Sequence, residues 1–354
     1  MGIFYREYCI LLQPVEKNRE LRINKDNRRA DNLLAFLHWA KMKDADYNLL
    51  MNENIFRVFG EILGGSANIR SLTEKTNLSR PTLLKTINIL TKNNFVGIKK
   101  KKPLIMDANL NDMTFFYINF HELSLKNFEG RFTIPEIPEI HSRELTEKLI
   151  KLHTYSTTVT EGNTATQEDV EKLFANYPVN LTPREITEIL NTKRAVELLY
   201  KIKEEVIETD RIEDVHRVLM VNLVDRAGEF YYGRKRIIGS ELKPPQSREE
   251  IETSINALLD FTGRYEHDIS SILLACIVHF IFVTIHPFID GNGRMGRILH
   301  SWIHLKNDMP LFVFDPNRKN RYFDALENGR KGSIDDFVVF CLKGMCDVLE
   351  ELTH

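Results

Sequence analysis

The residues best suited to chemistry lie in one run of twelve, which reads His-Pro-Phe-Ile-Asp-Gly-Asn-Gly-Arg-Met-Gly-Arg from His286 to Arg297. His286 is a titratable base that can accept a proton near neutral pH. Asp290 offers a hard oxygen ligand of the kind that Mg²⁺ takes alongside substrate phosphates. Arg294 and Arg297 are three residues apart, so on a helix both guanidinium groups can reach the same anion. This combination predicts phosphate-transfer chemistry.

The middle of the run predicts a place for the anion itself. Gly291, Asn292 and Gly293 adopt unusual backbone angles most readily, and successive amide N–H groups at the start of a helix form a concavity for an anion. The alternative is an ordinary glycine-rich turn with a solvated basic face. The base, the carboxylate and both arginines at fixed offsets favour the anion site.

The flanking sequence predicts two helices that position this turn. The stretch from Ile269 to Ile285 is apolar almost all round, and Pro287 should end a helix near His286. This stretch is short for a membrane span and contains His279, so a buried core helix is expected. After the turn, apolar residues recur at helical spacing at Ile298, Leu299, Trp302 and Ile303.

The run resembles the signature of the Fic family (filamentation induced by cAMP), His-x-Phe-x-Asp/Glu-Gly-Asn-Gly-Arg-x-x-Arg, at every constrained position. The resemblance implies a mainly helical Fic domain that transfers AMP from ATP to a Ser, Thr or Tyr hydroxyl of a protein. It implies that His286 is the base, that Asp290 holds Mg²⁺, and that ATP phosphates bind the turn. The residues expected to bind phosphate are Gly291, Asn292, Gly293, Arg294 and Arg297. Gly293 stands where the kinase branch of the family has lysine.

A second segment resembles the family's inhibitory motif, Ser/Thr-x-x-x-Glu-Gly/Asn. Thr157, Glu161 and Gly162 fit it, at the end of an expected inhibitory helix over residues 150–162. The resemblance implies that Glu161 pairs with Arg297 and blocks the γ-phosphate position. The alternative is that Glu161 only ends a helix and makes no contact with the site.

Two further regions resemble parts of the family more loosely. Residues 228–239 alternate enough to predict a hairpin that resembles the family's flap, with Arg236, Ile237, Ile238 and Gly239 docking the target by strand addition. In the segment 320–329, similar to the family's closing segment, adenosine contacts are expected from Tyr322 and Asn328. His216 is interpreted as a structural core histidine or a surface histidine. His300 and His304 have a spacing seen in zinc sites, but no third ligand is evident and coincidence is favoured.

The N-terminal part predicts a winged helix-turn-helix over about residues 54–120. Three helices are expected, the third opened by Ser79, followed by a hairpin of residues 95–106 and 114–120 with Lys99 to Lys102 near its tip. Such a fold either places its third helix in a DNA groove or serves as a protein-docking module. Both alternatives stay open at this point.

The whole chain is consistent with two domains, at residues 1–130 and 140–354 of 354, joined by a proline-containing linker from Arg131 to Pro138. The net charge of −2 excludes a global pull toward nucleic acid or membrane. Scattered cysteines and the lack of a signal-peptide pattern predict a cytoplasmic protein that does not engage membranes.

The fold class expected is therefore mainly α, with a Fic-type helical domain and a small β-hairpin flap behind a winged helix. The function expected is an adenylyltransferase using ATP and Mg²⁺, inhibited by Glu161, acting on a protein target and on itself, with a homodimer plausible from the resemblance. One alternative within chemistry is removal of AMP, and another is transfer of a different nucleotide or phosphodiester moiety. An alternative of another class is a DNA-binding regulator whose Fic domain senses nucleotide.

Overall fold

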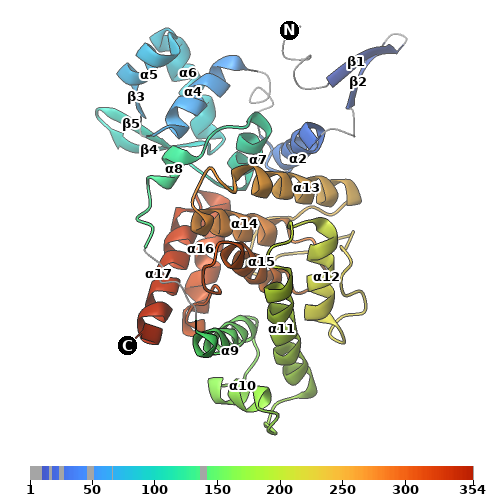
Figure 1. Ribbon diagram of the computed structural model, residues 1–354. Helices are drawn as coiled ribbons and strands as arrows, with labels where there is room; N and C mark the ends of the chain where they lie inside the picture. Colours follow the sequence, from blue (N-terminus) through green and yellow to red (C-terminus); the bar gives the residue numbers. More distant parts are fainter. Residues whose placement is uncertain are drawn as a thin grey trace. The chain divides into compact units, whose positions relative to one another are not determined.

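The computed structural model describes residues 10–15, 18–23, 28–45, 52–65, 67–135 and 142–353 (Figure 1). These fall into two compact units. The first draws on the chain up to Phe128 and on Ser247–Arg264, and the second on Glu129–Gln246 and on the chain from Tyr265 onward. Cys9 and part of the expected linker, residues 136–138, lie outside the described residues.

The first unit mixes helices with two small sheets. Its elements in chain order are β1 (Ile10–Val15), β2 (Asn18–Ile23), α2 (Arg28–Met42), α4 (Glu53–Leu63), β3 (Ala67–Asn68), α5 (Ile69–Thr76), α6 (Arg80–Lys92), β4 (Val96–Lys101), β5 (Leu104–Ala108), α7 (Asp112–His121), α8 (Lys126–Glu129), which continues into the second unit, and most of α13 (Arg248–Tyr265). β1 and β2 form one antiparallel pair, and β3, β5 and β4 form a second antiparallel sheet in that order.

The three helices predicted after residue 53 are present. Asn52 caps α4, and Ser79 caps α6 by accepting the amide of Thr82. Asn68 caps α5, the second of these helices, by accepting the amide of Ser71. The exposed Lys99–Lys102 lie near the tip of a hairpin, but its strands are β4 and β5, both of which fall largely within the single strand predicted for residues 95–106.

The second strand predicted for Thr114 to Phe120 is wrong. These residues lie in α7, which Asn111 and Thr114 open with a reciprocal capping box. All ten residues of α7 are buried, so apolar side chains face every direction. A helix buried on all sides has no polar face, and its aromatic and β-branched residues then resemble a strand.

The predicted domain boundary also misplaces α13, which groups with the first unit rather than with residues 140–354. Phe261 on α13 packs against Phe115 with ring centroids 4.6 Å apart. Asn119 donates to the Ala257 carbonyl at 2.8 Å, and Trp39 donates to Ser254 at 3.2 Å. These long-range contacts cannot be inferred from the local pattern of α13.

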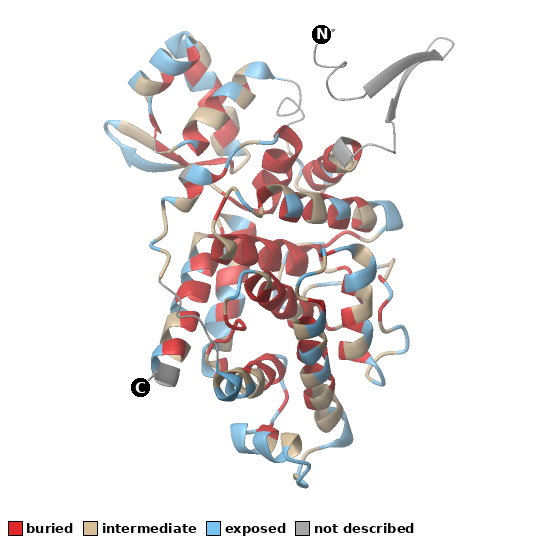
Figure 2. Cartoon of the chain, viewed as in Figure 1, coloured by how far each residue is buried: buried red, intermediate tan, exposed pale blue. Residues whose placement is uncertain are grey.

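The second unit is helical. Its elements are α9 (Arg143–Thr160), α10 (Gln167–Phe174), α11 (Pro183–Ile202), α12 (Thr209–Met220), α14 (Ser271–Ile285), α15 (Asn292–Lys306), the 3₁₀ turn η1 (Pro316–Arg318), α16 (Lys319–Lys331) and α17 (Asp335–Thr353). α14 and α15 pack side by side, with α17 against α14 and α11 against α15 (Figure 1). Every residue of α14 from Ile272 to Ile285 is buried, which makes it the core helix that its sequence predicts (Figure 2).

The flap hairpin predicted for residues 228–239 is wrong, because this segment contains no strand. Its backbone is tied to the core at Tyr231, whose N–H donates to the Pro287 carbonyl at 2.9 Å. A two-stranded ribbon without a neighbouring strand is marginally stable, so alternation alone does not secure a hairpin here. No helix in the described residues has the length and hydropathy needed to cross a membrane.

Candidate active site

The turn between α14 and α15 places His286 at its entrance. His286 is the C-cap of α14 in the left-handed region, with φ 55°, and its N–H donates to the Phe282 carbonyl. Its Nδ1 lies 3.4 Å from the Val283 carbonyl, which can only accept, so Nε2 carries the lone pair. Burial, with a smaller contribution from the nearby charge of Lys235, lowers the pKa of His286 to about 4. The imidazole is therefore neutral and able to accept a proton at neutral pH.

Phe288 and Asn292 fix the shape of the turn. The Phe288 ring is fully buried and stacks on His216, with centroids 3.6 Å apart and planes 1° apart. The Asn292 side chain bridges the backbone of Phe288, accepting its N–H and donating to its carbonyl, both at 2.9 Å. Asn292, whose backbone amide is expected to bind phosphate, thus also stabilises the turn through its side chain.

His216, interpreted from sequence as structural, holds the turn from the other side. Its Nδ1 accepts the N–H of Gly228 at 2.9 Å, so its Nε2–H donates to the Asp290 carbonyl at 3.0 Å. Burial lowers the pKa of His216 to about 4, which keeps one nitrogen as an acceptor. The residue ties the start of the flap segment to the turn, a link that no local sequence signal indicates.

The start of α15 presents backbone N–H groups. Gly291 is its N-cap with φ 80°, and no side chain caps the helix. A Cβ on Gly291 would lie 2.7 Å from Met220 Sδ, so both the angle and the space require glycine. The Asp290 carboxylate accepts the Gly291 N–H at 2.6 Å, at the edge of this concavity.

Glu161 lies in this concavity and pairs with Arg297. The Glu161 Oε1 is 2.6 Å from Arg297 Nη2, and the two side chains are 31% and 1% exposed. A Cβ on Gly293 would lie 2.3 Å from the same oxygen, so the carboxylate lies against the first turn of α15. Arg297 also donates to the Thr157 carbonyl at 3.2 Å. The contact expected between Glu161 and Arg297 is thus present.

Arg294 is buried beside a carboxylate that the sequence analysis did not single out. Its guanidinium lies 3.8 Å from Glu188 and 3.7 Å from Asp290, both longer than a good charge-assisted hydrogen bond. Glu188 also accepts from Asn163, two residues after Glu161. The buried Nε atoms of Arg294 and Arg297 have no hydrogen-bond partner among the described residues.

α9 brings Glu161 to the site through polar contacts. His153 Nδ1 donates to the Phe312 carbonyl at 2.7 Å, and Ser156 donates to the Phe314 carbonyl at 2.6 Å. Because these bonds join α9 to the backbone before η1, the position of Glu161 depends on how α9 docks.

The flap segment carries exposed side chains beside the turn. Arg236 is exposed and Ile238 is 100% exposed, while Gly239 has φ 78° in a turn closed by Ser240 N–H and the Ile237 carbonyl. Lys235, which the sequence analysis did not single out, is half-buried. Burial lowers its pKa to about 8.

The two expected adenosine contacts differ in location. Asn328 is exposed and donates to Asp336 at 3.3 Å. Tyr322 is only 1% exposed, and its hydroxyl is 3.3 Å from Arg297 Nη1. Its ring is enclosed in the core, so Tyr322 supports Arg297 and has no open face for an adenine.

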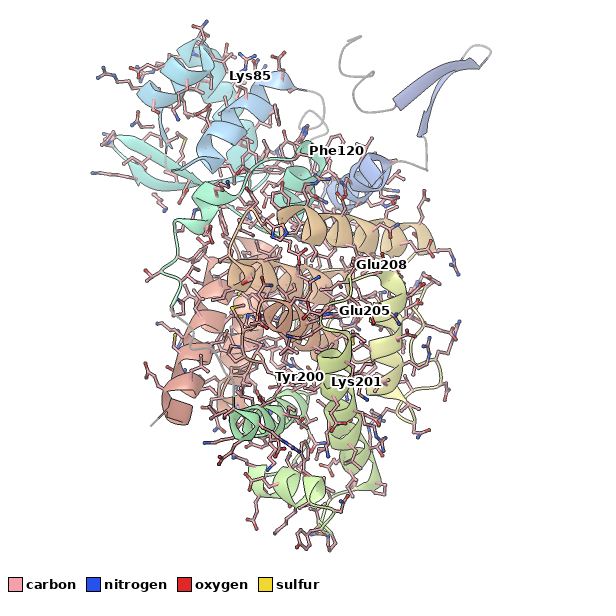
Figure 3. All side chains as sticks on the ribbon, viewed as in Figure 1. Lys85, Phe120, Tyr200, Lys201, Glu205 and Glu208 are labelled. Carbon is pink, nitrogen blue, oxygen red and sulfur yellow. The ribbon has the colours of Figure 1, made fainter. Side chains whose placement is uncertain are left out.

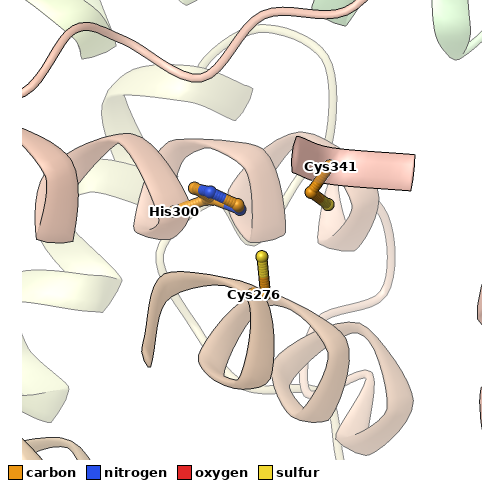
Figure 4. A group of neighbouring side chains, drawn as sticks. All are labelled: Cys276, His300 and Cys341. Atoms are coloured by element: carbon orange, nitrogen blue, oxygen red, sulfur yellow. The ribbon is translucent and has the colours of Figure 1, made fainter. Parts of the chain in front are cut away.

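The structure places two cysteines beside His300, in a group that does not include His304. Cys276 on α14 and Cys341 on α17 point toward His300 on α15, and their ligand atoms lie within 4.8 Å of one another (Figure 4). All three residues are buried, and burial raises the pKa of the Cys341 thiol. Sequence spacing missed the group because its members come from three helices.

Comparison with known proteins agrees with this geometry. Residues 206–304 match the Fic/DOC family. Protein adenylyltransferase Fic of Nematostella vectensis is 27% identical over 198 residues, which are 53% of this chain and 45% of that protein. Protein adenylyltransferase fic-1 of Caenorhabditis elegans is 26% identical over 214 residues, or 57% of this chain and 41% of that protein. The chain therefore spans less than half the length of these two relatives.

Solved structures show the same fold. A Fic family protein from Desulfovibrio desulfuricans G20 has a TM-score of 0.51 at 26% identity, covering 60% of this chain and 66% of that one. Fic-1 from C. elegans has a TM-score of 0.54 at 16% identity, covering 91% of this chain and 97% of that one. Residues 206–304 therefore resemble a Fic domain in sequence, and the helices around the turn share the fold of these solved structures.

Proposed function

We propose that the protein is an adenylyltransferase that transfers AMP from ATP to a Ser, Thr or Tyr hydroxyl of a protein, and that Glu161 inhibits it. The observation that carries the proposal is the Glu161 carboxylate, which lies at the N-terminus of α15 on Arg297. A helix N-terminus with two buried arginines favours an anion there. The chain's own carboxylate takes this place, and a nucleotide phosphate must compete with it.

His286 takes the proton from the acceptor hydroxyl. Its Nε2 bears the lone pair because Nδ1 donates to Val283. The hydroxyl oxygen then attacks the α-phosphorus of ATP, and pyrophosphate leaves. The amides of Gly291, Asn292 and Gly293 stabilise negative charge that develops on the phosphate oxygens. Arg294 binds the β- and γ-phosphates, and Arg297 binds the γ-phosphate once Glu161 withdraws.

Asp290 fits a magnesium ion that arrives with the nucleotide. Its carboxylate is about half exposed at the rim of the concavity, and one carboxylate with substrate phosphates and water is a usual set of ligands for Mg²⁺. The ion supplies neutralisation of phosphate charge. Arg184 and Arg294, each 3.7 Å from Asp290, hold the carboxylate at that rim.

The flap segment is the proposed docking place for the target. Arg236, Ile238 and Gly239 lie exposed, and Tyr231 ties the segment to the turn beside His286. A target segment bound at these exposed residues brings its hydroxyl toward His286. A hydroxyl of the protein itself that reaches His286 is modified in the same way, so self-modification is an expected side reaction.

Labelling with α-³²P-ATP and Mg²⁺ tests the proposal. Wild type, Glu161→Gly and Glu161→Gly/His286→Ala are compared, with γ-³²P-ATP as the control for phosphate transfer. Weak self-labelling that rises in the single variant and disappears in the double variant is expected from the α-label alone. Absence of label in all three variants contradicts the proposal, and labelling blocked better by another nucleotide identifies a different donor.

The N-terminal unit supports a second, separate proposal, DNA binding through a winged helix. Lys99–Lys102 are exposed at the β4–β5 tip, and Lys85 is exposed on α6 (Figure 3). Cations placed there can contact DNA phosphates. Duplex binding by the full chain at two salt concentrations tests this, and salt-insensitive or absent binding contradicts it.

A further inference from the structure

Three buried histidines lie behind Arg297. His279 belongs to α14, and His300 and His304 belong to α15; all three are fully buried among apolar neighbours. A buried imidazole needs hydrogen-bond partners on both nitrogens to avoid a desolvation cost. Each of the three has two such partners, and together they form one continuous chain.

The deep end of the chain fixes where the protons lie. His304 Nδ1 is 2.9 Å from the Pro310 carbonyl, which can only accept, so this nitrogen carries the hydrogen. A neutral His304 then has its lone pair on Nε2, 3.1 Å from His300 Nε2. His300 must therefore be the donor in that contact.

The same reasoning continues toward the site. His300 has its lone pair on Nδ1, which accepts from His279 Nδ1 at 3.4 Å. His279 Nε2 accepts the Tyr322 hydroxyl at 2.9 Å. The Tyr322 oxygen in turn accepts from Arg297 Nη1 at 3.3 Å. A guanidinium can only donate and a carbonyl can only accept. Arg297 at one end and Pro310 at the other therefore require the same direction of donation, from Arg297 toward Pro310.

We propose that Tyr322, His279, His300 and His304 are positioning residues that hold Arg297 for its anion through this one-way hydrogen-bond chain. Tyr322 takes Nη1, which leaves Nη2 directed at the Glu161 carboxylate. Burial lowers the pKa of all three histidines, which agrees with the neutral rings that the chain needs. The role in nucleotide binding rests on the proposed function, whereas the order of the protons does not.

The hydrogen-bond chain also determines whether the neighbouring thiols can bind a metal together with His300. A metal held by Cys276, His300 and Cys341 would need a lone pair of His300. The only one, on Nδ1, accepts from His279. Metal binding and this hydrogen-bond chain are therefore mutually exclusive. We expect purified protein to carry no metal on these three residues.

The tautomers provide the direct test. Long-range ¹H–¹⁵N correlation spectra of histidine-labelled full-length protein, assigned with single His→Gln variants, report which ring nitrogen carries the proton. The expected result is alternation, with hydrogen on Nδ1 of His279, on Nε2 of His300 and on Nδ1 of His304. A different pattern, a charged ring, or stoichiometric zinc in elemental analysis overturns the proposal.

Nucleotide affinity tests the positioning role. In the Glu161→Gly background, Tyr322→Phe should weaken ATP binding about tenfold, as expected for losing one hydrogen bond to a charged group. AMP binding should be unchanged, because AMP lacks the phosphate assigned to Arg297. Tyr200→Phe, the same substitution elsewhere in the second unit (Tyr200 is labelled in Figure 3), is the matched control.

The outcomes separate the two proposals. Equal weakening of ATP and AMP binding, or no weakening of either, shows that Tyr322 does not position Arg297 for its anion. If the Glu161→Gly parent binds no ATP, the proposed function fails, and the tautomer pattern still decides whether the chain exists.

Discussion

The Glu161–Arg297 pair makes a quantitative prediction for Glu161→Gln, which removes the charge and keeps the size of the side chain. Arg297 is 1% exposed and Glu161 is 31% exposed, so the pair lies between a buried and a surface ion pair. Breaking a buried pair costs about 3–5 kcal/mol and an exposed pair is worth about 0–1 kcal/mol, so about 2 kcal/mol is expected here. Because ATP must displace the carboxylate, the same energy should raise ATP affinity about 30-fold in the variant.

Calorimetric titration of ATP into both proteins measures this gain. Thermal unfolding should show a lower Tm for Glu161→Gln without nucleotide and a larger increase when ATP is added. Glu147→Gln is the control, because Glu147 forms an exposed pair with Arg143 on the same helix, α9, and should change neither quantity measurably. An ATP affinity within twofold of wild type in Glu161→Gln would refute the competition between carboxylate and phosphate.

Two further predictions concern stability. Burial places the pKa of His153, His216 and His304 at about 4, below the ordinary value of 6.5, so the unfolded chain binds protons that the folded chain does not as pH falls through this window. The free energy of unfolding should therefore decrease by about 1.4 kcal/mol per pH unit for each histidine, and denaturant titrations at pH 7 and about pH 5.5 that gave equal values would contradict the burial argument. Gly296→Ala should destabilise the protein by about 1–3 kcal/mol, because a Cβ there would lie 2.4 Å from Val283 and 2.6 Å from His279 where α14 and α15 pack. Gly263→Ala, whose Cβ meets nothing within 4 Å, is its control in the same denaturation assay, and equal stability of the two variants would contradict the prediction.

The residues of the central turn could be predicted from sequence because they are adjacent in the chain. A base, a carboxylate, three glycines and two arginines within twelve positions describe one local structure, and the helices on either side follow from apolar periodicity. The contact of Glu161 with Arg297 was accessible only through the family resemblance, since 136 residues separate the two.

The rest of the site comes from long-range packing. Glu188, His216 and Tyr322 reach the turn from α11, α12 and α16, and each looks locally like an ordinary helix residue. His279 carried a signal, as a polar interruption of an apolar run, but its partners were not identifiable from sequence. The hairpin prediction for residues 228–239 was wrong for a different reason, because alternation is a weak signal where an isolated two-stranded hairpin gains little stability.

The most direct measurement is the mass of the intact Glu161→Gly protein after incubation with ATP and Mg²⁺, beside the Glu161→Gly/His286→Ala double variant. The proposed chemistry predicts a gain equal to one AMP for each modified hydroxyl in the first protein and none in the second. A gain equal to one phosphate, the same gain in both proteins, or no gain in either would contradict AMP transfer by His286 at this turn.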